Sequence, residues 1–130
     1  MGGGTNHRFN LSDGILIKDN HIAVSGGIKN AVSNARKNAP HTLKIEVEVE
    51  TKQQLLEALE AKADIIMLDN MDNETMAKAV EIVDGKALLE ASGNLTKERL
   101  RSVAEIGVDI LSIGALTHSV TAFDISMRMK

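Results

Sequence analysis

Five polar strings in this sequence follow apolar, strand-like runs, and they contain many of the side chains best suited to chemistry. The apolar runs cover residues 14–18, 43–49, 64–68, 87–91 and 108–113. The polar strings cover residues 18–21, 48–50, 69–70, 90–94 and 114–118. Ligands of parallel α/β folds bind at the carboxyl ends of the strands. We therefore expect the polar strings to meet at one edge of a sheet and to form a site for a phosphorylated, anionic substrate.

Two carboxylates, those of Glu48 and Asp69, end consecutive predicted strands and could face each other across a cavity. Such a pair could coordinate Mg²⁺, hold sugar hydroxyls or stabilise a cationic centre. The alternative is a structural role, in which these carboxylates pair with Lys18 or Lys44 inside the fold. The residue types fit both interpretations.

Two strings that contain glycine, Ser92-Gly93-Asn94 and Ser112-Ile113-Gly114, are suited to binding an anion. Glycine lets a phosphate approach the backbone, and the free N–H groups of a following helix offer donors and a positive dipole end. Thr117 and His118 could add further donors, although His118 is equally typical of a surface position. The alternative for each glycine is an ordinary turn.

A third group of donors, Asn6-His7-Arg8, lies near the N-terminus. These side chains suit a carboxylate or a phosphate, which an arginine binds through its bidentate fork. The alternative is a solvated basic pair near the end of the chain.

Several classes of protein lack support in the sequence. The net charge of -3 argues against non-specific binding to nucleic acid or an acidic membrane, and the two aromatic residues, Phe9 and Phe123, make base stacking nearly impossible. There is no cysteine, which fits a reducing cytosol, and there is no HExxH, Walker A or GxGxxG motif. No apolar run approaches the roughly 20 residues of a membrane span, and the N-terminus does not resemble a signal peptide.

The segments between the apolar runs have helical periodicity, so the chain alternates strand and helix within one expected domain of residues 1–130. The first helix carries Ile28 to Ala35 and is closed by Pro40, and the second begins at Thr51 with Gln54 as a capping box. The third opens near Asp72, and the last opens at Thr96 and stops before Gly107, at a C-cap. Short loops between such units predict parallel strands joined by right-handed crossovers.

Five strands are too few for a closed eight-stranded barrel, so the chain is either part of a barrel or an open doubly wound sheet. The run 43–49 favours the barrel, because its apolar residues alternate with charged ones. A doubly wound strand is covered on both faces and is apolar throughout. We predict a partial (βα) barrel of about five parallel strands whose charged side chains point to a wet interior. An edge strand of a doubly wound, flavodoxin-like sheet is the alternative.

Six strings, in order, resemble the quinolinate phosphoribosyltransferase family, which is also called nicotinate-nucleotide pyrophosphorylase (carboxylating). The strings are Gly2-Gly-Gly-Thr-Asn-His7-Arg8, Leu16-Ile-Lys18-Asp-Asn-His21, Ile45-Glu-Val-Glu48-Val, Ile66-Met-Leu-Asp69-Asn70, Glu90-Ala-Ser-Gly93-Asn94 and Gly107-Val-Asp-Ile-Leu-Ser-Ile-Gly114-Ala-Leu-Thr-His118. The resemblance implies a cytoplasmic, dimeric enzyme of NAD biosynthesis with sites shared between subunits. It would join quinolinate to 5-phosphoribosyl-1-pyrophosphate with Mg²⁺ and release nicotinate mononucleotide, pyrophosphate and CO₂.

The resemblance also implies roles for individual residues. His7 and Arg8 would bind the quinolinate carboxylates, and Lys18 would lie between the two substrates. Glu48 and Asp69 would face the ribose and the metal. The phosphate region would be lined by Ser92, Gly93, Gly114 and His118.

The chain resembles only the C-terminal part of the family's α/β barrel, and the family's N-terminal domain is not represented in it. Positioning and electrostatic clamps carry much of such catalysis, so we expect the 130 residues alone to have little or no turnover. The alternative function is an excised or engineered fragment that retains at most phosphate binding. Unpaired strand edges favour association, so we expect a dimer or a sheet that flattens toward the doubly wound arrangement.

Overall fold

A parallel sheet forms the centre of the computed structural model, which describes residues 3–129. Gly2, the first residue of the N-terminal string, lies outside the described residues. The strands are β1 (Ile15–Ile17), β2 (Ile45–Val49), β3 (Ile65–Asp69), β4 (Leu88–Ser92) and β5 (Ile110–Leu111). All four strand pairings are parallel, as predicted.

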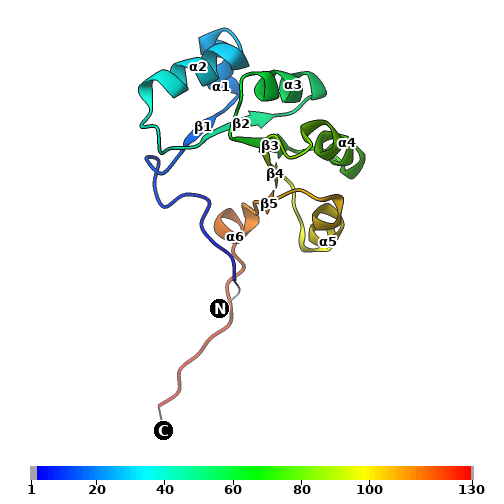
Figure 1. Cartoon of the computed structure of the whole chain (residues 1–130). Coiled ribbons are helices and arrows are strands. Elements are labelled where there is room, and N and C mark those ends of the chain that lie inside the picture. Colours follow the sequence, from blue (N-terminus) through cyan, green and yellow to red (C-terminus); the bar gives the residue numbers. More distant parts are fainter. Residues whose placement is uncertain (1–2, 130) are drawn as a thin grey trace.

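The strands are arranged in the sheet in the order in which they occur along the chain, β1-β2-β3-β4-β5. Each crossover therefore moves in the same direction, and right-handed crossovers of this kind place the connecting helices on one face (Figure 1). A doubly wound sheet reverses its direction at a switch point, which this strand order lacks. The open sheet therefore agrees with the predicted partial barrel and contradicts the doubly wound alternative.

The helices are α1 (Asp19–Ser25), α2 (Ile28–Asn38), α3 (Lys52–Glu60), α4 (Asn73–Val83), α5 (Lys97–Ile106) and α6 (Ala115–His118). The four predicted helices correspond to α2 to α5. The capping box of α3 is present, because the N–H of Gln54 donates to the Thr51 hydroxyl while the Gln54 side chain accepts from the N–H of Thr51. This reciprocal pair satisfies two N–H groups that the first turn of a helix cannot bond internally.

Two short helices, α1 and α6, begin in polar strings for which we predicted no helix. In α1, the N–H of Lys18 donates to Nδ1 of His21 at 2.9 Å, and Gly26 ends the helix in the left-handed conformation. In α6, the N–H groups of Thr117 and His118 donate to the carbonyl of Gly114. Each helix is too short to show the 3.6-residue periodicity on which the prediction depended.

The aliphatic core lies between the sheet and the helices. Fully buried side chains of the strands pack against fully buried side chains of the helices; those of the strands are Ile45, Val47, Val49, Ile66 and Leu68, and those of the helices are Ile28, Val32, Leu55, Met76 and Val103. Burying one such side chain contributes about 1.5–3 kcal/mol. This packing uses one side of each strand, so the alternate residues of the strands face away from the helices.

The face of the sheet that points away from the helices is less exposed to solvent than we predicted. Glu46 and Glu90 lie on it, and they are only 6% and 2% exposed. The segment before β1 brings His7 against both carboxylates, so at this depth the face is covered by the chain itself. Towards the carboxyl ends of the strands the face opens, since Lys18 is exposed and Glu48 is partly exposed.

Residues 119–129 form no helix or strand and extend away from the sheet (Figure 1). Their large apolar side chains are exposed; they are Val120, Phe123, Ile125, Met127 and Met129. Within residues 3–129, none of the helices has the length and apolar character needed to cross a membrane.

Candidate active site

The sheet register places the charged side chains in rows on the face away from the helices, which we call the open face. Leu16 pairs with Glu46, so two residues further along Lys18 and Glu48 lie side by side at the ends of β1 and β2. Glu48 pairs with Met67, which pairs with Glu90. Since side chains on one face of a sheet recur every second residue, all these side chains point away from the helices.

Lys18 and Glu48 form an ion pair across the β1–β2 pairing. The Lys18 Nζ lies 3.5 Å from Oε2 of Glu48, and the two side chains are 52% and 16% exposed. The structural alternative considered for Glu48, a pairing with Lys18, is therefore present in the structure. The pairing does not remove either group from chemistry, because both remain accessible from the open end of the face.

Asp69 is held by the two loops that follow β3 and β4. Its Oδ2 accepts a hydrogen bond of 2.7 Å from the amide of Asn70, and Ser92 pairs with Asp69 in the sheet register. Gly93 has a φ of +79°, and a Cβ atom there would lie 2.7 Å from Oδ1 of Asp69 and still closer to Asn70. Glycine is therefore required at this position twice over, by the backbone conformation and by the close approach of Asp69.

The loop after β5 brings Gly114 and His118 together. His118 turns back over the glycine, so that a Cβ atom on Gly114 would lie 3.0 Å from the His118 Nε2. The Nδ1 of His118 shares a hydrogen bond of 2.7 Å with the hydroxyl of Ser119. Because β4 and β5 are neighbours, this loop follows the strand next to the one that precedes Gly93.

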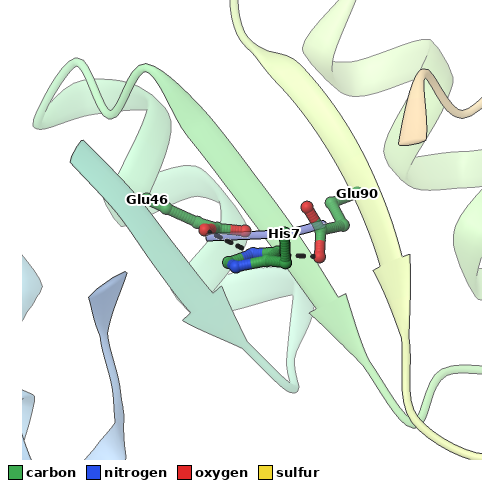
Figure 2. A group of neighbouring side chains, drawn as sticks. All are labelled: His7, Glu46 and Glu90. Carbon is green, nitrogen blue, oxygen red and sulfur yellow. Dashed lines mark ion pairs between the residues drawn. The ribbon is translucent and has the colours of Figure 1, made fainter. Parts of the chain in front are cut away.

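His7 and Arg8 do not act as one group in this structure. Arg8 donates from Nη1 to the carbonyl of Gly14 at 3.5 Å. His7 instead points to Glu46 and Glu90, with its Nε2 3.1 Å from Oε2 of Glu46 and 3.5 Å from Oε1 of Glu90 (Figure 2).

Burial and, after it, the neighbouring Glu90 carboxylate together raise the pKa of Glu46 to about 8, while Arg8 opposes the shift. Near neutral pH the Glu46 carboxyl therefore holds its proton much of the time. A neutral carboxylic acid can donate a hydrogen bond as well as accept one, which eases its position beside a second carboxylate.

Sequence reasoning did not identify Glu46 as part of a site, and it gave Glu90 no role beyond its place in the string 90–94. A signal was present, since Glu46 alternates with apolar residues on the same strand face as Glu48, and Glu90 belongs to the polar string that ends β4. The contact with His7 gave no such signal, because it joins segments that are far apart in the sequence.

Two sets of residues offer ligands for a metal ion. Glu48 and Asp69 supply carboxylate oxygens at the open end of the face. His7, Glu46 and Glu90 each offer one atom, and these atoms lie within 4.8 Å of one another.

Known proteins of one family are similar to this chain over nearly all of its residues. The family model for the quinolinate phosphoribosyl transferase C-terminal domain matches residues 1–128. A probable nicotinate-nucleotide pyrophosphorylase (carboxylating) of Bacillus subtilis is 50% identical over 126 residues, which are 97% of this chain and 44% of that protein. The corresponding protein of Methanocaldococcus jannaschii is 46% identical over 98% of this chain and 47% of its own length.

Solved structures agree with the sequence matches. The nicotinate-nucleotide pyrophosphorylase of Francisella tularensis superposes with a TM-score of 0.89 at 46% identity, covering 96% of this chain and 44% of that structure. A thiamine phosphate pyrophosphorylase of Pyrococcus furiosus gives a TM-score of 0.64 at 27% identity, over 79% of this chain and 50% of that structure. The chain spans somewhat less than half the length of the curated relatives described above. The family match over nearly all of its residues shows that the chain belongs to the quinolinate phosphoribosyl transferase family, as part of the C-terminal domain.

Proposed function

We propose that this chain provides the C-terminal part of the catalytic domain of a nicotinate-nucleotide pyrophosphorylase (carboxylating). The reaction would join quinolinate to 5-phosphoribosyl-1-pyrophosphate and yield nicotinate mononucleotide, pyrophosphate and CO₂. The family match and the names of the relatives support this proposal.

The observation that carries the proposal is the Lys18–Glu48 pair on the same sheet face as Asp69, which lies two residues beyond the partner of Glu48 in β3. Departure of pyrophosphate leaves positive charge on the ribose ring, and carboxylates fixed in advance can stabilise that charge as it develops. In the proposed mechanism Glu48 and Asp69 do this, while Lys18 lies between the two anionic substrates. Positioning of the substrates contributes as much as any single group.

The phosphate groups would bind at the loops after β4 and β5. The backbone of Gly93 and the hydroxyl of Ser92 would contribute donors, beside the Asp69 and Asn70 side chains that approach Gly93 closely. Gly114 and His118 would line the neighbouring loop, with His118 as a donor. Two adjacent loops of this kind near the end of a barrel are a common phosphate site.

The quinolinate carboxylates would bind to Arg8 and His7. Arg8 is suited to a bidentate contact, and its bond to the Gly14 carbonyl is long enough to be exchanged for a carboxylate. His7 has its Nε2 turned to Glu46 and Glu90. Its binding of a substrate carboxylate therefore requires donation from Nδ1 or a turn of the ring.

The carboxylates of Glu48 and Asp69 fit Mg²⁺ in their chemistry. Mg²⁺ prefers oxygen ligands and is usually held by one or two carboxylates together with substrate phosphates. When bound with 5-phosphoribosyl-1-pyrophosphate, it would neutralise charge on the pyrophosphate leaving group. Glu48 has a second oxygen besides the one that faces Lys18, so it can serve both groups.

We further propose that the complete enzyme is a cytoplasmic dimer and that the 130 residues alone turn over little or no substrate. The alternative function, a fragment that retains at most phosphate binding, is favoured by one observation. The chain covers 44% and 47% of the length of two relatives.

A titration of 5-phosphoribosyl-1-pyrophosphate into the chain, followed by calorimetry, tests the proposed site. Lys18→Ala and Glu48→Gln should each weaken binding, while Lys29→Ala and Glu60→Gln should not, because Lys29 and Glu60 form an exposed surface pair. Circular dichroism checks that all four variants remain folded. If neither Lys18→Ala nor Glu48→Gln changes the affinity, the proposed site is wrong.

A further inference from the structure

The cluster of His7, Glu46 and Glu90 contains more buried carboxyl oxygens than its neighbours satisfy. Glu46 and Glu90 are 6% and 2% exposed, and each has an oxygen, Oε1 in both cases, that finds no hydrogen-bond partner among residues 3–129. A buried polar atom without a partner costs about 1–3 kcal/mol, and more when the group is charged. Such an arrangement needs a cation or a donor to stabilise it.

The neighbouring protein groups supply too little. A neutral imidazole donates one N–H through Nε2, and here two carboxylates face that one atom. Arg8, the nearby cation, donates to the carbonyl of Gly14. Lys18 is paired with Glu48. Oε1 of Glu46 and Oε1 of Glu90 are therefore left without a hydrogen bond from residues 3–129, although Oε1 of Glu90 lies 3.5 Å from Nε2 of His7.

The spacing of the donor atoms in the cluster is close to that around a small divalent ion, and all three atoms lie within 4.8 Å of one another. Bonds of about 2.1 Å place adjacent donors roughly 3.0–3.4 Å apart in octahedral or tetrahedral coordination. The Nε2 of His7 is 3.1 Å from one Glu46 oxygen and 3.5 Å from one Glu90 oxygen. Glu46 lies on β2 and Glu90 on β4, and His7, from the segment before β1, lies between them (Figure 2).

The donor set selects the class of ion. One imidazole nitrogen and two carboxylate oxygens suit Zn²⁺, Mn²⁺ or Co²⁺, whereas Mg²⁺ prefers an all-oxygen set. Two ionised carboxylates balance the charge of a divalent ion, so Glu46 releases its proton when the ion binds. The His7 side chain is 31% exposed, which gives the ion a path from solvent.

We propose that His7, Glu46 and Glu90 bind a divalent first-row transition-metal ion at a site separate from the Glu48–Asp69 carboxylates. With three ligands from the protein, the ion keeps at least one open coordination position. The proposal needs neither of the substrates of the proposed function, so binding can be measured without them.

Calorimetric titration of Zn²⁺ into the full chain, in excess Mg²⁺ and near neutral pH, tests the proposal. We expect saturable binding of about one Zn²⁺ per chain, weakened more than about tenfold by His7→Ala and by Glu90→Gln. The matched controls are His41→Ala and Glu60→Gln, which change an exposed histidine and an exposed glutamate and should leave the affinity unchanged.

A second measurement uses Co²⁺, whose visible absorption reports its ligands and coordination number. The spectrum of the unchanged chain should be lost in His7→Ala, which alters a segment outside the helices and strands and so keeps the fold. The proposal is overturned if the unchanged chain shows no saturable Zn²⁺ binding, or if affinity and Co²⁺ spectrum are the same in His7→Ala as in His41→Ala.

Discussion

The ammonium group of Lys18 lies 3.5 Å from the carboxylate of Glu48, across the pairing of β1 with β2. The pair joins the ends of two strands whose sequences are separated by two helices. Because Lys18 is about half exposed, the attraction between the groups is screened by water. Such a pair contributes little to stability and stays available to bind charged ligands.

Lys18→Met should therefore separate stability from function. We expect the free energy of unfolding to change by less than about 1 kcal/mol, because exposed ion pairs are weak. Affinity for 5-phosphoribosyl-1-pyrophosphate should fall, since the cation beside the anionic ligand is lost. Urea denaturation and calorimetry measure the two quantities, and a large loss of stability without a change in affinity would assign Lys18 a structural role.

Gly93→Ala should disturb Asp69. A Cβ atom at Gly93 would lie 2.7 Å from Oδ1 of Asp69, and the φ of +79° strains any side chain. We expect a loss of about 1–3 kcal/mol in unfolding free energy, together with weaker phosphoribosyl binding.

The matched control for that variant is Gly85→Ala. Gly85 has a similar φ of +71°, but a Cβ atom there meets nothing within 4 Å. This variant should show only the backbone cost, about 1 kcal/mol, with unchanged binding. Equal losses in both variants would mean that the contact with Asp69 has no energetic consequence.

Stability should fall as the pH rises from about 5 to 8, because the folded state raises the pKa of Glu46 to about 8. The folded chain then holds a proton that the unfolded chain has released, so the stabilisation present at low pH is lost as pH rises through the folded pKa. The expected change is on the order of a few kcal/mol. Urea denaturation across this range measures it.

Glu46→Gln should flatten this pH dependence, since glutamine carries no proton to lose. Glu60→Gln is the control, because Glu60 is an exposed surface residue and its substitution should leave the slope unchanged. A slope that persists in Glu46→Gln would assign the pH dependence to other groups.

Thr51→Ala should destabilise α3 by about 1 kcal/mol, since the hydroxyl accepts the N–H of Gln54 in the capping box. Thr96→Ala at the start of α5 is the comparison, because the Thr96 side chain accepts no capping hydrogen bond. Thermal unfolding should show the larger loss for Thr51→Ala. A larger loss for Thr96→Ala would contradict the assigned capping roles.

Turnover provides the test of the fragment itself. We expect no measurable nicotinate mononucleotide from the purified chain with both substrates and Mg²⁺, because it spans less than half of its relatives. Chromatography of the reaction mixture measures the product. Formation of product at an appreciable rate would contradict this expectation.

The sequence by itself determined the alternation of strand and helix, since the long helices have clear apolar periodicity and the strands are continuous or alternating apolar runs. It also located the Lys18, Glu48, Asp69 and Gly93 strings, because parallel strands bring their carboxyl ends to one edge. The short helices α1 and α6 could not be predicted, since seven and four residues show too little periodicity.

Only the tertiary structure decided which side chains meet. The strand order excluded the doubly wound sheet, a choice that depends on pairings between segments rather than on any local pattern. The sheet register placed Glu46 and Glu90 on one buried face, and the segment before β1 then brought His7 between them. Local sequence dictates which face of a strand a residue occupies, but the chain that covers that face is set by the packing of the whole domain.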